Sequence, residues 1–185
     1  MFDGEIRERH CGYYSKNKSQ LKRMTRLVKK LFKLKPAISQ RDNNVLKLTW
    51  HSIELKNYSQ NKYKELLCYI KDTSQLEKKA FLRAFFDDEG CVTFNKDNKR
   101  IRGYQYSKTI LQLVRKLLKD FGIESHIDKR NTEVTITGIE NLIKFRNEIN
   151  FSPDIFVNPG RKNGLWKYKI GKKTILEKAI EQSRI

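Results

Sequence analysis

The sequence predicts an α+β fold built from two similar halves. Over residues 75–149, segments with helical periodicity alternate with pairs of short strands, in the order helix, two strands, helix, two strands, helix. Residues 5–71 repeat this order without the opening helix. The paired strands alternate apolar and polar residues with a period of two, which is typical of antiparallel sheets. We therefore expect two pseudo-symmetric αββαββα repeats, with the first helix of the first repeat mostly missing.

The second half carries the clearer pattern. Apolar residues recur at helical spacing over residues 75–89, and Gly90 is a good stop for that helix. Two alternating segments flank residues 97–99 and predict a β-hairpin with strands over 91–96 and 100–106. The remaining predicted elements are a helix over 107–121, a hairpin with strands over 125–129 and 132–137, and a helix over 139–149.

The first half follows the same plan. Asp3-Gly4 stands where Glu89-Gly90 stands in the second half, and the triplet Tyr14-Ser-Lys16 echoes Tyr106-Ser-Lys108. The predicted elements are a short strand over 5–9, a helix over 21–32, a hairpin with strands over 37–40 and 45–50, and a helix over 51–71. We therefore assign residues 1–71 to the first repeat, 76–150 to the second, and 151–185 to a basic extension that is irregular until a helix near 174–182.

Composition narrows the class of partner. The 185 residues include 40 Lys or Arg and 21 Asp or Glu, for a net charge of +19, and 38% of the residues are hydrophobic. A disordered basic tail lacks that apolar content, so a folded protein that contacts a polyanion, most commonly nucleic acid, is expected. No apolar stretch has membrane-spanning length and no signal peptide is recognisable, so we expect an intracellular, cytoplasmic protein, with organellar expression left open.

Strand alternation predicts which side chains point away from the core. Val92 and Ile101 in the second hairpin, and Ile6 in the first repeat, are expected to face inward. The opposite faces are rich in Arg, Asn and Thr, the side chains that a sheet in a DNA major groove uses to read base edges, although a solvated face is the alternative. The candidate DNA contacts are Arg7, Arg9, Lys47, Thr49, Thr93, Asn95, Arg100, Arg102 and Tyr104.

Two further basic runs contain no acid. Residues 16–35 hold nine basic side chains, and residues 160–173 hold six. The first run falls on a helix that should back the sheet, so we expect much of it to be solvated. The second is a candidate for additional phosphate contacts, which would make binding strongly salt-dependent.

The segment Phe81-Leu-Arg-Ala-Phe-Phe-Asp-Asp-Glu-Gly90 resembles the dodecapeptide motif of the LAGLIDADG homing endonucleases. The element order is also similar to this family over roughly residues 2–150, as a two-repeat type whose first motif is reduced to Phe2-Asp3-Gly4. The resemblance implies that the two motif helices pack together and that the two sheets form a DNA-binding saddle. Without its partner helix, the second motif would expose an apolar stripe at Phe81, Ala84 and Phe85.

The resemblance also implies a metal site. In the family, the acid before each Gly binds a divalent cation, usually Mg²⁺ or another such as Mn²⁺; here these acids are Asp3 and Glu89, with the backbone carbonyl of Asp88 as a further ligand. An acid is unfavourable at the negative end of a helix dipole, so Glu89 needs a reason to be there. A bound cation relieves the repulsion between two close carboxylates. Lys16 and Lys108 are the candidates for the basic side chain near each scissile phosphate, or are solvated lysines at helix starts.

By this resemblance, the expected function is a site-specific, Mg²⁺-dependent endonuclease that cuts both strands of double-stranded DNA. The alternatives are a non-cleaving protein on the same scaffold, either an RNA maturase or a DNA-binding regulator, or a degenerate endonuclease. Retention of Asp3 and Glu89 favours the nuclease. The shortened first motif is explained by a start further upstream, by a homodimer, or by decay; we expect a monomer with pseudo-twofold symmetry.

Overall fold

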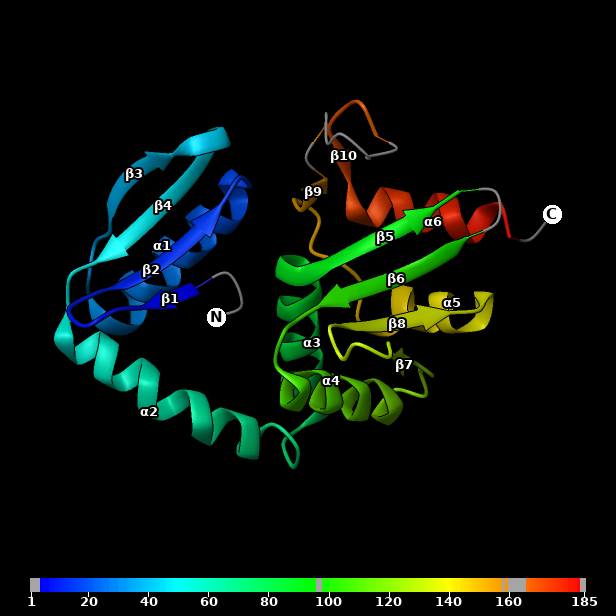
Figure 1. Cartoon of the computed structure of the whole chain (residues 1–185), viewed down its shortest axis with the longest axis horizontal. Coiled ribbons are helices and arrows are strands. Elements are labelled where there is room, and N and C mark those ends of the chain that lie inside the picture. The colour runs from blue at the N-terminus through cyan, green and yellow to red at the C-terminus, as the bar shows by residue number, and fades with distance from the viewer. Residues whose placement is uncertain (1–3, 96–97, 158, 160–165, 184–185) are drawn as a thin grey trace. The chain divides into compact units, whose positions relative to one another are not determined.

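The computed structural model describes residues 4–95, 98–157, 159 and 166–183, apart from the side chains of Asn43 and Lys64. The chain forms two compact units, Met1–Leu66 and Leu67–Ile185. Each unit contains a four-stranded antiparallel sheet (Figure 1). The predicted α+β class with repeated αββα units is confirmed.

The first unit is built around a sheet with the strand order β1-β2-β4-β3. Tyr13 and Leu48 pair across the two central strands, and both side chains are buried in the core. The inward orientation predicted for Leu48 and Trp50 is therefore confirmed. The elements are β1 (Gly4–Ile6), β2 (Cys11–Ser15), α1 (Lys18–Phe32), β3 (Ala37–Arg41), a 3₁₀ turn (Asp42–Asn44), β4 (Val45–Trp50) and α2 (Ile53–Tyr69).

Strand β1 is shorter than predicted. It ends at Ile6 rather than at residue 9, because the backbone N–H of Arg7 donates to the carbonyl of His10 at 2.9 Å and turns the chain toward β2. The expectation that Ile6 faces a closed core is wrong, since this residue is 38% exposed. An edge strand of three residues is covered on one side only, which accounts for the exposure.

The second unit repeats the arrangement with the strand order β5-β6-β8-β7. Val92 pairs with Ile101, which in turn pairs with Ile136, and all three side chains are buried. The predicted inward face is therefore confirmed. The elements are α3 (Gln75–Glu89), β5 (Gly90–Phe94), β6 (Lys99–Tyr104), α4 (Lys108–Asp120), β7 (His126–Ile127), β8 (Glu133–Thr137) and α5 (Ile139–Glu148).

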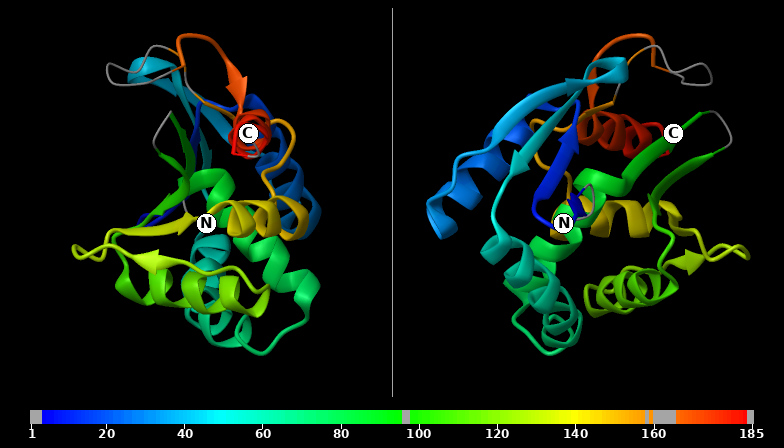
Figure 2. Two further views of the ribbon diagram at one scale, coloured as in Figure 1. Left: turned by 90° about the vertical axis from the view of Figure 1, so that its right-hand side faces the viewer. Right: turned by 60° about the vertical axis from the view of Figure 1, so that its left-hand side comes forward.

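The C-terminal extension is more ordered than predicted. Strand β9 (Phe156–Val157) pairs with β10 (Ile170–Gly171), and α6 (Lys172–Glu181) begins directly afterwards (Figure 2). Helix α6 contacts β5 and α5, with Ile175, Leu176 and Ala179 buried. The prediction of an irregular segment was wrong because two-residue strands leave almost no periodicity to detect.

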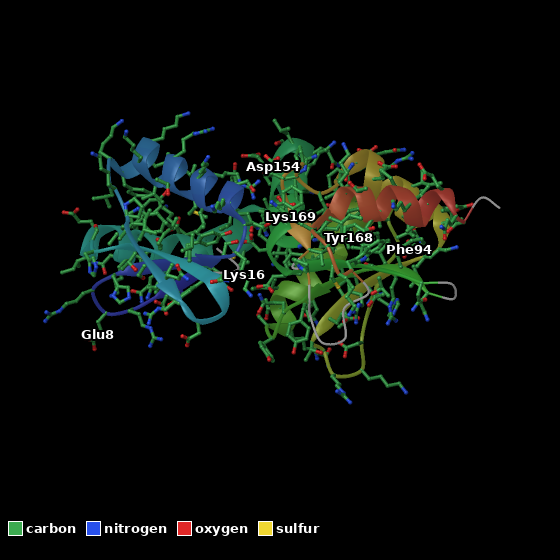
Figure 3. All side chains as sticks on the ribbon, turned by 90° about the horizontal axis from the view of Figure 1, so that it is seen from above. Glu8, Lys16, Phe94, Asp154, Tyr168 and Lys169 are labelled. Carbon is green, nitrogen blue, oxygen red and sulfur yellow. The ribbon has the colours of Figure 1, made fainter. Side chains whose placement is uncertain are left out.

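The segment before α6 also packs against β5. The Phe94 and Trp166 rings are stacked with centroids 6.3 Å apart, and the Trp166 ring meets Tyr168 edge to face. Figure 3 labels Phe94, Tyr168 and Lys169 in this region. Lys169 places its ammonium 4.1 Å from the centroid of Phe156. The extension is thus joined to the second unit by apolar and cation–π contacts.

Helix α3 has defined ends. The Ser74 hydroxyl accepts from the N–H of Glu77, whose carboxylate in turn accepts from the N–H of Ser74, in a capping box. Gly90 ends the helix in an extended conformation, with φ −83°. A Cβ there would lie 2.3 Å from the carbonyl oxygen of Phe86, so the glycine is required by close approach rather than by a left-handed turn.

The predicted exposed stripe on α3 is only partly observed. Ala84 is exposed and Phe81 is half-buried, but Phe85 is fully buried. The Phe85 ring lies against Gly103 of β6, where a Cβ would come within 2.4 Å of Cε1. The missing side chain of Gly103 therefore makes the room for this ring, which the helical spacing alone does not indicate. No helix in the described ranges is long and apolar enough to cross a membrane.

We predict that Gly103→Ala destabilises the second unit by about 1–3 kcal/mol, because an added methyl overpacks the contact with Phe85 and Phe86. Gly171→Ala is the control, since its Cβ would meet nothing closer than 3.4 Å. Urea denaturation of both variants measures the difference. Equal stability of the two variants would show that the Phe85 ring is not held against β6.

Candidate nucleic-acid interface and metal site

Three consecutive acids lie at the C-terminal end of α3. Asp87 is buried, with 1% of its surface exposed, while Asp88 and Glu89 are half-buried. Negative charge at this end of a helix opposes the helix dipole. Asp87 is compensated by Ser152, whose backbone N–H and hydroxyl donate to the carboxylate at 2.9 and 2.5 Å. Asp87 is therefore structural, and Asp88 and Glu89 are the more accessible acids at this helix end.

A buried ammonium closes the same helix end. Lys172 is 7% exposed, and its Nζ donates to the carbonyl oxygens of Phe86 and Asp87 at 3.2 and 2.7 Å. Lysine at a helix C-terminus satisfies unpaired carbonyls and offsets the dipole. The expectation that the basic tail contacts phosphate does not hold for Lys172, because its charge is turned inward. Lys167, Lys169 and Lys173 are exposed.

The predicted metal ligands are only partly described. Asp3 lies outside the described residues, and Glu89 and Asp88 occupy the last turn of α3. Within the described ranges, no three His, Cys, Asp or Glu side chains are grouped to hold a metal. Mg²⁺ needs no such cage, because it keeps several waters and takes one or two carboxylates together with substrate phosphates. An exposed carboxylate such as Glu89, beside a backbone carbonyl, fits that preference.

The outer face of the second sheet carries the predicted cationic residues. Arg100 pairs with Thr93 and Thr137, and Arg102 pairs with Cys91 and Thr135, so both arginines project from the face opposite the core. Nη1 of Arg102 donates to Glu133 Oε2 at 3.2 Å. The Nε atoms of Arg100 and Arg102 are shielded from solvent and have no hydrogen-bond partner among the described residues.

Two other residues predicted on this face behave differently. Asn95 follows β5 and closes the turn to β6, where its Oδ1 accepts from the N–H of Asn98 at 2.7 Å. The prediction that Asn95 reads DNA from the strand is wrong in its placement, because Asn and Asp favour turns. Tyr104 is 42% exposed, and its ring meets Tyr106 edge to face with centroids 5.2 Å apart. Thr93 is half-buried on the predicted face.

The outer face of the first sheet contains an ion pair. Lys47 forms a salt bridge and hydrogen bond with Glu5, and its side chain is 8% exposed. The prediction that Lys47 is available to DNA is therefore corrected: it lies on the predicted face but is buried against an acid. The pair crosses over Gly12, where a Cβ would lie 2.9 Å from Cγ of Glu5 and 3.0 Å from Cε of Lys47.

A shallow hollow surrounds this ion pair. It has a volume of about 640 Å³ and is lined by Glu5, Arg7, Glu8, Arg9, His10, Tyr14, Arg41 and Lys47. Arg7 and Arg9 are exposed, as predicted, but they lie in the turn beyond β1 and not on a strand. Nε of Arg7 donates to Glu5 at 3.2 Å, and Glu8 projects outward from the turn (Figure 3). Thr49 is half-buried on the same sheet face.

The charges of this cluster are coupled. Hydrogen bonding to Lys47 is the main cause that lowers the pKa of Glu5 from 4.5 to about 2, with further contributions from Tyr14 and Arg7. The same contact raises the pKa of Lys47 above its ordinary value. Both groups therefore stay charged across the neutral range. Glu5 and Glu133 were not predicted as part of either face, although the strand alternation places them there.

The two Tyr-Ser-Lys triplets are not equivalent in the sheets. Gly4 pairs with Tyr13, and Gly90 pairs with Gly103. Counting from these pairs, Tyr14 corresponds to Tyr104, and the second triplet lies two positions further along the chain.

The helix caps agree with this count. Asn17 is the N-cap of α1 and Ser107 is the N-cap of α4, so Lys108 corresponds to Lys18 and not to Lys16. Lys16, Lys18 and Lys108 are all exposed. The sequence echo that suggested a matched pair of lysines is thus a coincidence of composition.

Comparison with known proteins supports the family resemblance. Residues 77–150 match the family described as the LAGLIDADG-like domain. This part of the chain is a LAGLIDADG-like domain. It includes α3 from Glu77 onward and ends after α5, so the match excludes the C-terminal extension. No curated protein matches the chain.

Solved structures share the fold of both repeats. Mesophilic variants of the homing endonuclease I-DmoI match with a TM-score of 0.60 and 25% identity, over 78% of this chain and 77% of theirs. I-DmoI in complex with DNA and Ca matches with a TM-score of 0.58 and 25% identity, over 78% and 76%. The N-terminal LAGLIDADG domain of DUF199/WhiA matches with a TM-score of 0.60 and 22% identity, over 82% and 78%. The two-repeat LAGLIDADG fold is thereby shown.

We predict that acid weakens the first unit through Glu5. Its folded pKa is depressed, so its stabilising contribution is present above the ordinary value of 4.5 and is lost as the pH falls toward about 2. Glu5→Gln should flatten the loss of stability across this window, and Glu8→Gln, which changes an exposed neighbour, should not. Urea denaturation followed by Trp50 fluorescence in a Trp166→Phe background measures the effect. A wild-type pH profile unchanged by Glu5→Gln contradicts the prediction.

Proposed function

We propose that this chain is a site-specific endonuclease that binds double-stranded DNA and hydrolyses both strands with a divalent metal ion. The observation that carries the DNA-binding part is the outer face of β5, β6 and β8. Two arginines there have solvent-shielded Nε donors without a partner among the described residues. Buried donors are normally paired, so these are suited to an incoming acceptor such as a phosphate or a guanine edge.

The proposed cleavage site is the end of α3. Glu89 would hold the metal ion, with the Asp88 carbonyl as a further ligand and Asp3 as the acid contributed by the first repeat. A bound Mg²⁺ or Mn²⁺ would polarise the phosphate and lower the pKa of a water. I-DmoI, at 24% identity, has been crystallised with its target DNA in the presence of Mg, and in a separate structure with DNA and Mn. These relatives support the choice of metals.

The basic side chains have separate proposed roles. Lys16 and Lys108 remain the candidates to stand near the scissile phosphates, and Lys18 joins them because it is the positional counterpart of Lys108. All three are at or just before the first turn of a helix, where anions bind favourably. Arg7 and Arg9, exposed beyond β1, would contact the DNA backbone. We propose that the protein acts as a monomer, using its two repeats on one site.

A non-cleaving nucleic-acid-binding protein is the second candidate. The observation in its favour is the match to WhiA, which has the same fold at 22% identity. Both candidates require the arginine face, and they differ only at the end of α3. The experiments below therefore separate binding from cleavage.

We predict that Glu89→Gln abolishes cleavage and preserves binding. Duplexes that the wild-type chain enriches from a randomised DNA pool supply the substrate, and Mg²⁺ starts the reaction. Loss of the metal-holding carboxylate should lower the cleavage rate by about 100-fold or more, the order seen when a charge-stabilising group is removed. Glu140→Gln, which changes an exposed acid on α5, should cleave at the wild-type rate. Enrichment without cleavage by the wild type would support the binding protein instead.

We predict that Arg100→Ala weakens DNA binding by about 1–3 kcal/mol and lowers the salt slope of log K by about 1 if it contacts phosphate, or relaxes sequence preference if it reads a base. Arg115→Ala removes the same charge from the exposed side of α4 and is the matched control. Fluorescence anisotropy at several salt concentrations measures both. An equal loss of affinity in the two variants would reduce the arginine face to a nonspecific charge effect.

A further inference from the structure

We propose that Lys172 and Ser152 are positioning residues that hold the metal-binding end of α3. The inference rests on the proposed function for the role of Glu89, but the contacts that carry it are independent of that function. Both residues lie beyond residue 150, outside the matched LAGLIDADG-like domain. The extension would therefore complete the site rather than only enlarge the DNA-binding surface.

Three ties connect α3 to the segment that follows α5. Nε and Nη2 of Arg83 donate to the carbonyl of Ile149 at 2.8 and 2.6 Å. Ser152 donates twice to the Asp87 carboxylate. Lys172 donates to the carbonyls of Phe86 and Asp87. The ties follow one side of the helix toward its C-terminal end and stop at the residues just before Asp88 and Glu89.

The position of Lys172 is itself fixed. Its backbone N–H donates to the carbonyl of Ile155 at 2.8 Å, and the preceding residue Gly171 pairs with Phe156 in the short ribbon. Its ammonium also lies 5.7 Å from the centroid of the Phe151 ring. The side chain therefore enters the helix end from a rigid start of α6. A lysine so placed is pre-organised and does not search for its partners.

Burial of this ammonium has an electrostatic purpose. An isolated buried charge is strongly unfavourable unless it meets opposite charge and hydrogen-bond partners. The last turn of α3 supplies both, since it combines partial negative carbonyls with three acids. Lys172 thus offsets charge that would otherwise unwind the turn, and it does so from inside the protein. The outward side of the turn stays open to a metal ion and a phosphate.

Ser152 fixes the direction of the turn. Asp87 is one residue before Asp88, and its carboxylate is held by two donors on the same residue. With Asp87 locked inward, the 100° step between helical residues sets where Asp88 and Glu89 point. Rotation of the last turn would break the Ser152 contacts before it moved Glu89.

The test compares Lys172→Met with Lys173→Met, which removes the same charge from an exposed neighbour on α6. Lys172→Met should raise the Mg²⁺ or Mn²⁺ concentration for half-maximal cleavage by about 10–100-fold, the range found when a supporting contact to a metal ligand is lost. Titration calorimetry with Mn²⁺ should show the same loss of affinity. DNA affinity without metal should stay at the level of Lys173→Met, and Lys172→Arg should restore part of the metal affinity. An unchanged metal dependence in Lys172→Met overturns the proposal.

Two further measurements keep the result interpretable. Ser152→Ala removes one donor and leaves the backbone N–H, so it should fold and show a smaller shift in the same direction. Amide hydrogen exchange should be faster at residues 86–90 in Lys172→Met than in Lys173→Met, whether or not the chain cleaves DNA. If the wild type binds no Mn²⁺ and cuts no DNA, the proposed function fails, and the exchange rates alone decide the anchoring. Equal exchange in the two variants contradicts it.

Discussion

The structure of the second unit depends on how one helix end carries too much negative charge. Helix α3 ends in Asp87, Asp88 and Glu89, where its dipole is already negative. Two distant residues make this possible, since Ser152 binds the first carboxylate and Lys172 binds the last carbonyls. The arrangement explains why a lysine is buried in a chain with a large excess of exposed basic residues. It also explains why the extension folds back onto the domain instead of trailing from it.

The outer faces of the two sheets show how positive charge is held in place without a ligand. In the first sheet Lys47 is paired with Glu5, and in the second Arg102 is paired with Glu133. Each acid fixes the orientation of a long side chain and lowers the local excess of charge. A face made only of unpaired arginines would bind any polyanion, whereas paired ones require a ligand that competes with the carboxylate. On the proposed function, these acids contribute to specificity rather than to affinity.

Much of the fold could be predicted because its signals are local. The helix over 75–89, both long hairpins and the buried positions at Leu48 and Ile101 follow from periodicity within short windows. The errors arise where tertiary contacts decide. The burial of Lys47 depends on Glu5, which lies on a strand far away in sequence, and the inward turn of Lys172 depends on the end of α3. Asn95 failed for a local reason, since turn chemistry outweighed the strand pattern.

The candidate site divides in the same way. Glu89 was predictable from its motif, whereas the residues that hold its helix end were hidden within a run read only as positive charge. The repeat itself misled in one respect. Matching the letters Tyr-Ser-Lys aligned Lys16 with Lys108, but strand register and helix caps align Lys18 with Lys108. Register is the stronger criterion because a shift in pairing changes which face each side chain occupies.

The corrected register has a consequence for the kind of DNA that the two sheets would suit. Position 12 corresponds to position 102, so a glycine in one sheet stands where an arginine stands in the other. Lys47 corresponds in the same way to Glu133, which reverses the sign of the charge. Gly12 leaves the space through which Lys47 reaches Glu5, while Arg102 fills that space and reaches Glu133 instead. The two faces thus share one backbone plan and present different donors and acceptors. On the proposed function, the two halves of the target would be read differently, and the preferred site would not be a palindrome.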